Sequence, residues 1–272
     1  MKIKLVATDL DGTLIPTGRS TPEIVLDTLE EVMEQGIYVV PATGRTLSGI
    51  PSEILSLTGL RYVISSNGAV ITDVQTGQRV YERLIPPAEA AALLRRLYTY
   101  DAYACAYIEN QPFNWRTLPG FLRRYYRNIA FFQQNPRYDL AAYIEENALH
   151  VEKIFVAVAS QEEKVLLRSE MRQFSDLQLT STSAWNLELT YRDADKGNAL
   201  AWLGKSLSIL PEEILAMGDN ENDHTMLRLA GIAVTPSNGT DATREIADMV
   251  IPSCDHCGTA SYLREHLLKG GK

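Results

Sequence analysis

The stretch VATDLDGTLI, residues 6–15, joins an apolar, strand-forming run to two acids that are separated by a single leucine. Residues 2–8 are rich in β-branched and apolar types, which predicts a β-strand that ends just before Asp9. Asp11 and Gly12 then form a turn signal. Because two carboxylates this close repel each other, the rest of the sequence has to supply whatever offsets that repulsion.

Strands and helices alternate on both sides of this segment. A helix is predicted to begin at a capping box of Ser20 and Glu23, to run to Glu34 and to stop at Gly36. Further strands are predicted at GIYVVPAT (36–43), RYVISSN (61–67), EILAMG (213–218), GIAV (231–234) and DMVI (248–251), each beside a predicted helix. This alternation predicts an α/β fold with a doubly wound, Rossmann-like parallel sheet that is buried on both faces.

The middle of the chain has a different character. Residues 69–85 read as a hairpin that turns at Thr76 and Gly77, and an alanine- and leucine-rich helix follows Pro86. From there to about Trp185 the pattern mixes strands and helices and is rich in tyrosine, phenylalanine and arginine. We therefore expect a core of residues 1–83 and 187–272, with an α+β domain of residues 84–186 inserted into it.

Composition excludes several classes of partner. The chain has 272 residues and a net charge of -8, with no basic block, which argues against nucleic acid and against an anionic membrane surface. No apolar run approaches the roughly 20 residues that span a bilayer, and no secretory signal is visible. Three cysteines without a disulfide pattern indicate a reduced, cytoplasmic protein.

Polar residues gather where the predicted parallel strands end. Ligands bind outside the carboxyl ends of strands in such sheets. Asp9 and Asp11 follow the first strand, and Thr43, Gly44 and Arg45 follow the second. Lys196 opens a helix after the insertion, and Gly218–Asp223 follow a later strand. Several carboxylates at one edge favour Mg²⁺, whose preferred ligands are oxygens. A carboxylate can also attack phosphorus, while a lysine, a threonine and backbone N–H groups can neutralise phosphate.

These residues also resemble a family signature. The motifs are DLDGTL (9–14), ATGR (42–45), SNGA (66–69), the lysine of DKGNAL (195–200) and GDNEND (218–223). In this order, and over the whole chain, they resemble the haloacid dehalogenase (HAD) superfamily of hydrolases, and within it the Cof-type capped sugar-phosphatase branch. The resemblance implies a HAD core, an inserted cap of the C2 type and an aspartyl-phosphate intermediate.

The resemblance implies a role for each matched residue. Asp9 would be the nucleophile, and Asp11 would protonate the leaving oxygen and then activate water. Mg²⁺ would be held by Asp9, by the backbone carbonyl of Asp11 and by Asp219. Phosphoryl oxygens would be bound by Thr43, Gly44, Lys196, Asn222 and the backbone N–H groups of Leu10 and Asp11. Asp223 would orient Lys196 or a water on the metal.

One loop departs from the family pattern. The branch usually reads G-V-A-M-G-N-A after the strand that follows GDNEND, whereas this chain has GIAVTPSNG at residues 231–239. Thr235 and Pro236 replace a flexible glycine and lengthen the loop. The contacts made near Asn238 therefore stay open at the level of sequence.

Three other patterns favour structural explanations. Cys254 and Cys257, with His256 and His266, have zinc-like spacing, but no second pair completes the site, so packing is the preferred explanation. The sequence GKS at 204–206 lacks the leading glycine of a P-loop and lies in a predicted helix. Arg123, Arg124 and Arg127 are typical of a solvated helix face, with a contact to an anionic substrate as the alternative.

The sequence thus predicts a Mg²⁺-dependent phosphatase that hydrolyses small phosphomonoesters, such as a sugar phosphate or a similar metabolite, through an aspartyl-phosphate. Two enzymatic alternatives stay open: a phosphomutase or phosphotransferase that uses the same intermediate, and a phosphatase for a cofactor phosphate such as FMN or pyridoxal phosphate. A receiver-like phospho-switch is disfavoured. In receivers the paired acids and the phosphorylated aspartate lie on different strands, and no domain is inserted between them.

Overall fold

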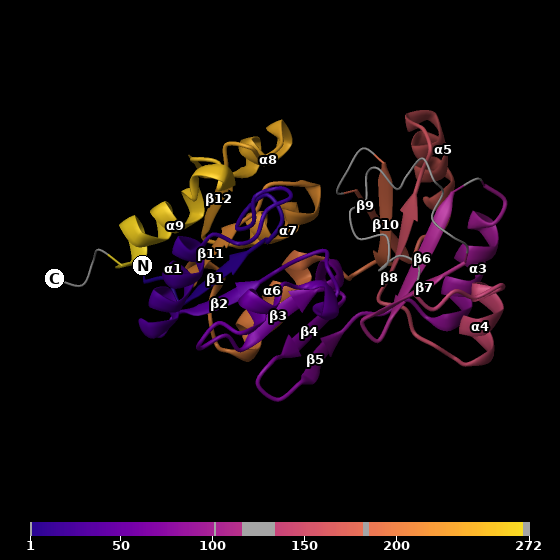
Figure 1. Ribbon diagram of the computed structural model, residues 1–272, viewed down its shortest axis with the longest axis horizontal. Coiled ribbons are helices and arrows are strands. Elements are labelled where there is room, and N and C mark those ends of the chain that lie inside the picture. Colours follow the sequence, from indigo (N-terminus) through magenta and orange to yellow (C-terminus); the bar gives the residue numbers. More distant parts are fainter. Residues whose placement is uncertain (1, 101, 116–133, 182–184, 269–272) are drawn as a thin grey trace. The chain divides into compact units, whose positions relative to one another are not determined.

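The structure, a computed structural model, describes residues 2–100, 102–115, 134–181 and 185–268 (Figure 1). The chain divides into two compact units. The core unit comprises Met1–Glu82 and Asp195–Lys272, and the cap unit comprises Arg83–Ala194. Each unit has its own sheet and its own hydrophobic core.

The core unit is built on a five-stranded parallel sheet with the order β13-β12-β11-β1-β2. Its strands are β1 (Leu5–Thr8), β2 (Tyr38–Pro41), β11 (Ile214–Met217), β12 (Ile232–Pro236) and β13 (Met249–Ile251). The first strand, β1, is an interior strand, since it pairs with β11 on one side and with β2 on the other. The doubly wound parallel sheet that the sequence predicts is therefore confirmed.

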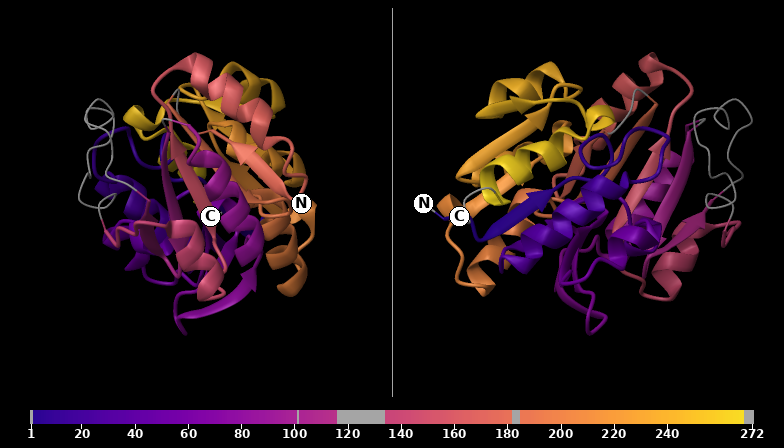
Figure 2. Two further views of the ribbon diagram at one scale, coloured as in Figure 1. Left: turned by 90° about the vertical axis from the view of Figure 1, so that its right-hand side faces the viewer. Right: turned by 60° about the vertical axis from the view of Figure 1, so that its left-hand side comes forward.

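Helices cover both faces of this sheet (Figures 1 and 2). They are α1 (Glu23–Glu34), α2 (Ser52–Leu55), α6 (Lys196–Ser206), α7 (His224–Leu229), α8 (Asp241–Ile246) and α9 (Gly258–Leu263). Along β1, Val6 packs with α1 and α9, whereas Leu5 and Ala7 pack with α6 and α7. Because successive side chains of a strand point to opposite faces, an apolar strand of this kind must be buried on both sides.

The start of α1 differs from the prediction. The capping box of Ser20 and Glu23 is wrong, because Pro22 is the residue that precedes the helix and no side chain caps it. Proline suits this place, since its φ is already near the helical value and it has no N–H to leave unpaired. The predicted stop is confirmed: Gly36 has φ +76° and its N–H donates to the carbonyl of Met33 at 2.9 Å.

The third predicted strand does not extend the parallel sheet in full. It is β3 (Tyr62–Ser65), which forms an antiparallel three-stranded sheet with β4 (Val70–Asp73) and β5 (Gln78–Glu82). A single parallel bridge from Ala42 to Ile64 connects it to the end of β2. The hairpin at Thr76 and Gly77 is confirmed and joins β4 to β5.

The cap unit is an α+β layer structure. Its antiparallel sheet has the order β7-β6-β8-β10-β9. The strands are β6 (Tyr103–Ile108), β7 (Gln111–Asn114), β8 (Lys153–Ala157), β9 (Leu177–Thr180) and β10 (Asn186–Tyr191), and the helices are α3 (Pro87–Leu97), α4 (Leu140–Glu146) and α5 (Gln161–Met171). Apolar side chains of all three helices share one core with one face of the sheet. The other face carries Tyr103, Tyr107 and the buried ion pair of Lys153 and Glu188, at 2.9 Å.

The return to the core comes later in the chain than the sequence indicates. Residues 187–194 were expected in the core, but β10 pairs with both β8 and β9, and the core unit resumes at Asp195. An apolar run such as LELTY forms a strand in either sheet, so only pairing decides its place. The arginines at 123, 124 and 127 lie outside the described residues.

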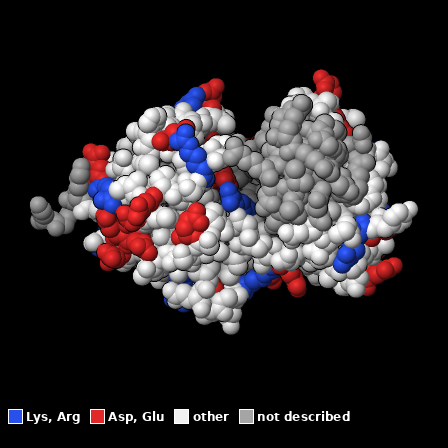
Figure 3. Space-filling view, in the orientation of Figure 1, with Lys and Arg blue, Asp and Glu red and all other residues white. Residues whose placement is uncertain are grey.

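The surface charge and the helix lengths agree with what the composition indicates. On the face in Figure 3, acidic side chains gather over part of the core unit, and the visible lysine and arginine side chains are scattered. None of the described helices combines the length and the apolar character that a bilayer crossing requires.

Candidate active site

The carboxyl ends of β1, β2 and β11 coincide at one edge of the core sheet. In the register of the sheet, Thr8 lies opposite both Pro41 and Met217. The residues just beyond these ends, Asp9, Thr43 and Asp219, are therefore brought to the same edge. Asp9 is also held by its N–H, which donates to the carbonyl of Met217 at 2.9 Å.

A buried lysine joins two of the carboxylates. Lys196 is the first residue of α6 and is fully buried. Its ammonium donates to Asp9 Oδ1 and to Asp223 Oδ1, both at 2.6 Å. The preceding residue, Asp195, caps the helix by accepting from the N–H of Asn198 at 2.9 Å. The cap fixes where the helix begins and therefore fixes the base of the lysine side chain.

Asp223 has both oxygens engaged. Oδ1 accepts from Lys196, and Oδ2 accepts from the backbone N–H groups of Asp219 and Asn220 at 2.9 and 3.0 Å. The residue is fully buried. It therefore shapes the GDNEND turn and holds the lysine in place at the same time.

Asp219 faces the loop that follows β1. Its Oδ1 accepts from the Thr13 hydroxyl at 3.2 Å, and its backbone carbonyl accepts from the N–H of Thr240 at 3.0 Å. Gly12 passes so close that a Cβ there would lie 2.5 Å from Asp219 Oδ2. Gly12 also has φ +88°, a conformation that side-chain-bearing residues rarely adopt.

The cluster is short of positive charge. Carboxylate oxygens of Asp9, Asp219 and Asp223 all lie within 4.8 Å of one another, and Lys196 is the ammonium that pairs with two of them. Burial, and then the charge of Asp223, raises the pKa of Asp219 to about 7. Burial also raises the pKa of Asp9 well above its usual range, although Lys196 opposes the shift. Burial lowers the pKa of Lys196, but the charges of Asp223 and Asp9 outweigh it and raise the pKa overall.

These donors fit a hard divalent cation. Asp9 and Asp219 each keep one carboxylate oxygen without a hydrogen-bond donor among the described residues, whereas both oxygens of Asp223 are used. Oxygen-only donors and a surplus of negative charge suit Mg²⁺. A cation here would offset the repulsion between carboxylates, which adds to burial in raising the pKa of Asp9 and of Asp219.

A second group of polar residues surrounds Thr43. Its side-chain oxygen accepts from the N–H of Arg45 at 3.2 Å, and its carbonyl accepts from the N–H of Asn67 at 3.0 Å. Asn67 Oδ1 in turn accepts from Asn222 Nδ2 at 3.1 Å and lies 2.8 Å from where a Cβ on Gly44 would be. The buried residue Asn67 thus binds Thr43 through its backbone, and its side chain binds Asn222 and lies against Gly44.

The loop after Asp9 presents unused backbone donors. The carbonyl of Leu10 accepts from the N–H groups of Thr13, Leu14 and Ile15 at 2.8 to 3.3 Å. The N–H groups of Leu10 and Asp11, by contrast, donate to no other described residue. Such N–H groups, at the sheet edge that also carries Thr43, are suited to bind an anion.

Asp11 stands apart from the other acids. Its side chain is 56% exposed and is not part of the carboxylate cluster. Instead, Arg45 Nε donates to Asp11 Oδ2 at 2.7 Å and Arg45 Nη2 donates to Asp11 Oδ1 at 2.6 Å. The structure therefore gathers Asp9, Asp219 and Asp223 within 4.8 Å and pairs Lys196 with two of them. The carboxylate of Asp11 is paired with Arg45 instead.

Sequence reasoning assigned no role to three residues of this site. Arg45 and Asn67 lie inside the ATGR and SNGA motifs, so the motifs themselves were the available signal. Asn238 gave a weaker signal, because the longer loop obscured its place. Its Nδ2 donates to the carbonyl of Gly12 at 2.8 Å, and its Oδ1 accepts from the N–H of Cys254 at 3.0 Å. This amide supports the loop that follows Asp9.

The zinc interpretation of Cys254 and Cys257 finds no support among the described residues. Both thiols are free, Cys254 is buried, and Cys257 packs against the hydrophobic core. The aspartate cluster is the metal-capable group that the described part of the chain contains. The GKS sequence forms the last three residues of α6, as expected for a helix rather than a P-loop.

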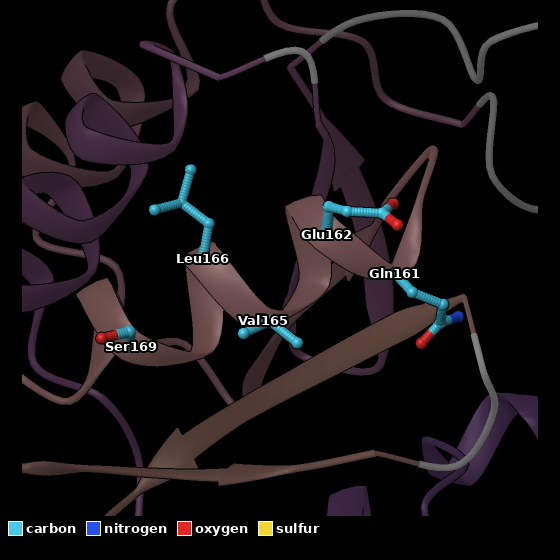
Figure 4. Close-up of a pocket in the computed structure, with 5 residues that line it drawn as sticks. All are labelled: Gln161, Glu162, Val165, Leu166 and Ser169. Atoms are coloured by element: carbon cyan, nitrogen blue, oxygen red, sulfur yellow. The ribbon is translucent and has the colours of Figure 1, made fainter.

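A shallow pocket in the cap unit has a different character. It lies on α5 and is lined by Gln161, Glu162, Val165, Leu166 and Ser169 (Figure 4). Val165 and Leu166 are exposed, and Glu162 is the one ionisable group among these residues. The pocket offers no set of groups that converge for catalysis.

Gly12 gives a direct test of how closely the loop must approach Asp219. We expect Gly12→Ala to lower kcat/KM on the order of 10²-fold, because the new Cβ would push the Asp219 carboxylate away. We also expect it to lower the free energy of unfolding by about 1–2 kcal/mol, the cost of a left-handed alanine. Steady-state kinetics and thermal unfolding measure the two effects separately.

Gly36→Ala is the matched control. Gly36 also has positive φ, at +76°, but a Cβ there would meet nothing within 4 Å. It should show the loss of stability without the loss of activity. Equal activity losses in the two variants would mean that the contact between Gly12 and Asp219 does not matter.

Comparison with known proteins agrees with this geometry. Residues 6–263 match the family of haloacid dehalogenase-like hydrolases. The phosphatase YwpJ of Bacillus subtilis is 30% identical over 98% of this chain and 100% of its own length. The 5-amino-6-(5-phospho-D-ribitylamino)uracil phosphatase YcsE of the same organism is 25% identical over 98% of this chain and 96% of its own length.

A solved structure extends the likeness to the fold. A haloacid dehalogenase-like hydrolase from B. subtilis superposes with a TM-score of 0.83 at 27% identity, over 97% of this chain and 100% of that one. The match therefore includes the inserted unit as well as the parallel core. The chain belongs to the haloacid dehalogenase-like hydrolases, as a phosphatase of their capped, Cof-type branch.

Proposed function

We propose that this phosphatase hydrolyses small phosphomonoesters with the help of Mg²⁺ and through an aspartyl-phosphate on Asp9. The observation that carries the proposal is the position of Asp9, which is buried, is held by Lys196 and precedes two backbone N–H groups that donate to no other described residue. Lysine and N–H groups at this place can bind the anionic phosphoryl group against a carboxylate that would otherwise repel it.

In the first step, a carboxylate oxygen of Asp9 forms a bond to phosphorus as the bond from phosphorus to the ester oxygen breaks. Asp11, in its protonated form, gives its proton to the departing oxygen, and an alcohol leaves. Lys196, Thr43 and the N–H groups of Leu10 and Asp11 bind the phosphoryl oxygens. These contacts stabilise the charge that develops there.

In the second step, water attacks phosphorus and the bond to Asp9 breaks. Asp11, now a carboxylate, accepts a proton from the water, and inorganic phosphate leaves. Asp223 keeps Lys196 in place through both steps, because its second oxygen is tied to the backbone of Asp219 and Asn220. The enzyme returns to its starting state with a proton on Asp11.

Asp9, Asp219 and the backbone carbonyl of Asp11 would hold Mg²⁺. When bound, the ion neutralises the carboxylates and reduces the repulsion between them and the phosphate. Asn222, which contacts Asn67, would bind a phosphoryl oxygen as well. We further propose that residues of the cap unit select the substrate.

Metal removal tests this proposal. We expect EDTA to abolish phosphate release from a panel of sugar phosphates, nucleotides and cofactor phosphates, and Mg²⁺ to restore it. Calcium should restore little, since it prefers more ligands at longer distances than Mg²⁺ does. Release of inorganic phosphate is measured by a colorimetric assay.

Two results would contradict the proposal. Full activity in EDTA would show that the reaction does not require Mg²⁺. Transfer of the phosphoryl group to an added sugar hydroxyl, with little free phosphate, would favour the phosphotransferase alternative over hydrolysis.

A further inference from the structure

The guanidinium of Arg45 is anchored at several points. Nε and Nη2 bind the two oxygens of Asp11, and Nη1 donates to the carbonyl of Gly49 at 2.9 Å. The backbone is fixed too, since its N–H donates to the Thr43 hydroxyl and its carbonyl accepts from the N–H of Ser66 at 2.7 Å. Arg45 thus connects the turn at Thr43 and Gly44 to the Asp11 carboxylate.

The fork between Arg45 and Asp11 has a geometric consequence. Two parallel N–H···O bonds fix both the position and the plane of a carboxylate, which a single ammonium contact does not do. The fork uses two of about four lone-pair sites of the carboxylate, so the others can still accept from water. It also keeps Asp11 away from the cluster of Asp9, Asp219 and Asp223.

We propose that Arg45 is the positioning residue that holds Asp11 as the base for hydrolysis of the phospho-enzyme. The inference rests on the proposed function, in which Asp11 takes a proton from the attacking water. An unanchored Asp11, with its exposed side chain, would sample several rotamers, and few of them would place an oxygen beside that water. Arg45 touches neither the substrate nor the phosphorus in this scheme and acts through Asp11.

The proposal predicts a step-specific defect. With 4-nitrophenyl phosphate, whose leaving group needs little help from an acid, formation of the phospho-enzyme should stay fast in Arg45→Gln. Its hydrolysis should slow by about 10-fold or more. Rapid quenching followed by intact-protein mass spectrometry should therefore show a larger steady-state fraction of phosphorylated protein, together with a lower kcat.

Two companion variants sharpen the test. Arg45→Lys keeps the charge but cannot form the fork, so it should accumulate phospho-enzyme almost as Arg45→Gln does. Arg61→Gln is the matched control, because Arg61 also pairs with an aspartate, Asp73, at 3.2 Å, and lies at the opposite end of β3 from the site. It should leave both kcat and the phosphorylated fraction unchanged. Thermal unfolding verifies that each variant is folded.

The outcomes separate this inference from the proposed function. Asp11→Asn should trap phospho-enzyme if Asp11 is the base. If it does so while both Arg45 variants turn over without accumulation, the role of Arg45 is wrong and the mechanism stands. If neither the wild type nor Asp11→Asn carries phosphate on Asp9, the mechanism itself fails.

Discussion

Asp9→Asn should abolish turnover, with a loss in kcat of at least about 10⁴-fold, because an amide oxygen is a poor nucleophile toward phosphorus. The substitution keeps the size of the side chain and leaves the ion pair of Lys196 and Asp223 in place. The fold should therefore persist. Phosphate release gives the kinetic measurement, and intact mass after rapid quenching should show no phosphorylated protein in the variant.

Asp27→Asn is the matched control for this change. Asp27 is an exposed residue of α1, so its loss of charge should leave activity unaltered. If kcat of Asp9→Asn were within about 10-fold of the wild type, the covalent mechanism would be excluded, since loss of a nucleophile lowers kcat far more than 10-fold. Loss of activity together with loss of the folded state would instead assign Asp9 a structural role.

Lys196→Met should have the second largest effect, on stability as well as on activity. The Lys196 ammonium contacts the buried carboxylates of Asp9 and Asp223, each at 2.6 Å, and the variant would leave both carboxylates without it. Breaking a buried ion pair in this way lowers the free energy of unfolding by about 3–5 kcal/mol. Thermal or denaturant unfolding in EDTA measures this loss, and phosphate release in Mg²⁺ should fall near background.

Two further variants interpret that result. Lys205→Met removes an exposed lysine from the same helix and should change neither property. The double variant of Lys196→Met with Asp223→Asn should recover part of the stability, because one uncompensated charge is gone, but none of the activity. A double variant that is no more stable than Lys196→Met would show that repulsion between carboxylates is not the cause.

The sequence determined the parallel core and the identity of the acids at its edge. The apolar run before Asp9, and the runs that became β2, β11 and β12, are readable because buried parallel strands are apolar on both faces. The strand ends then follow, and the motifs fall there. This logic predicts one site for Asp9, Asp11 and the acids of GDNEND. The structure places the carboxylates of Asp9, Asp219 and Asp223 within 4.8 Å and pairs that of Asp11 with Arg45.

The sequence did not determine pairing. The run that became β10 could have paired in either sheet, and its place in the cap unit depends on partners far away in the chain. The sequence also predicts the start of α1 wrongly. Ser20 and Glu23 match a capping box, whereas Pro22 is the residue that precedes the helix. Local signals compete on nearly equal terms at such points, so tertiary context decides.

The tertiary structure alone decided how the charges divide. The order of residues does not say that Lys196 binds Asp9 or that Arg45 binds Asp11, and the family resemblance leaves Asp223 with either Lys196 or a water on the metal. These pairs join segments up to 187 positions apart, and their geometry depends on strand register and helix starts to within an ångström. Residue types can therefore be predicted from motifs, whereas the partner of each charge follows from the packing of the folded core.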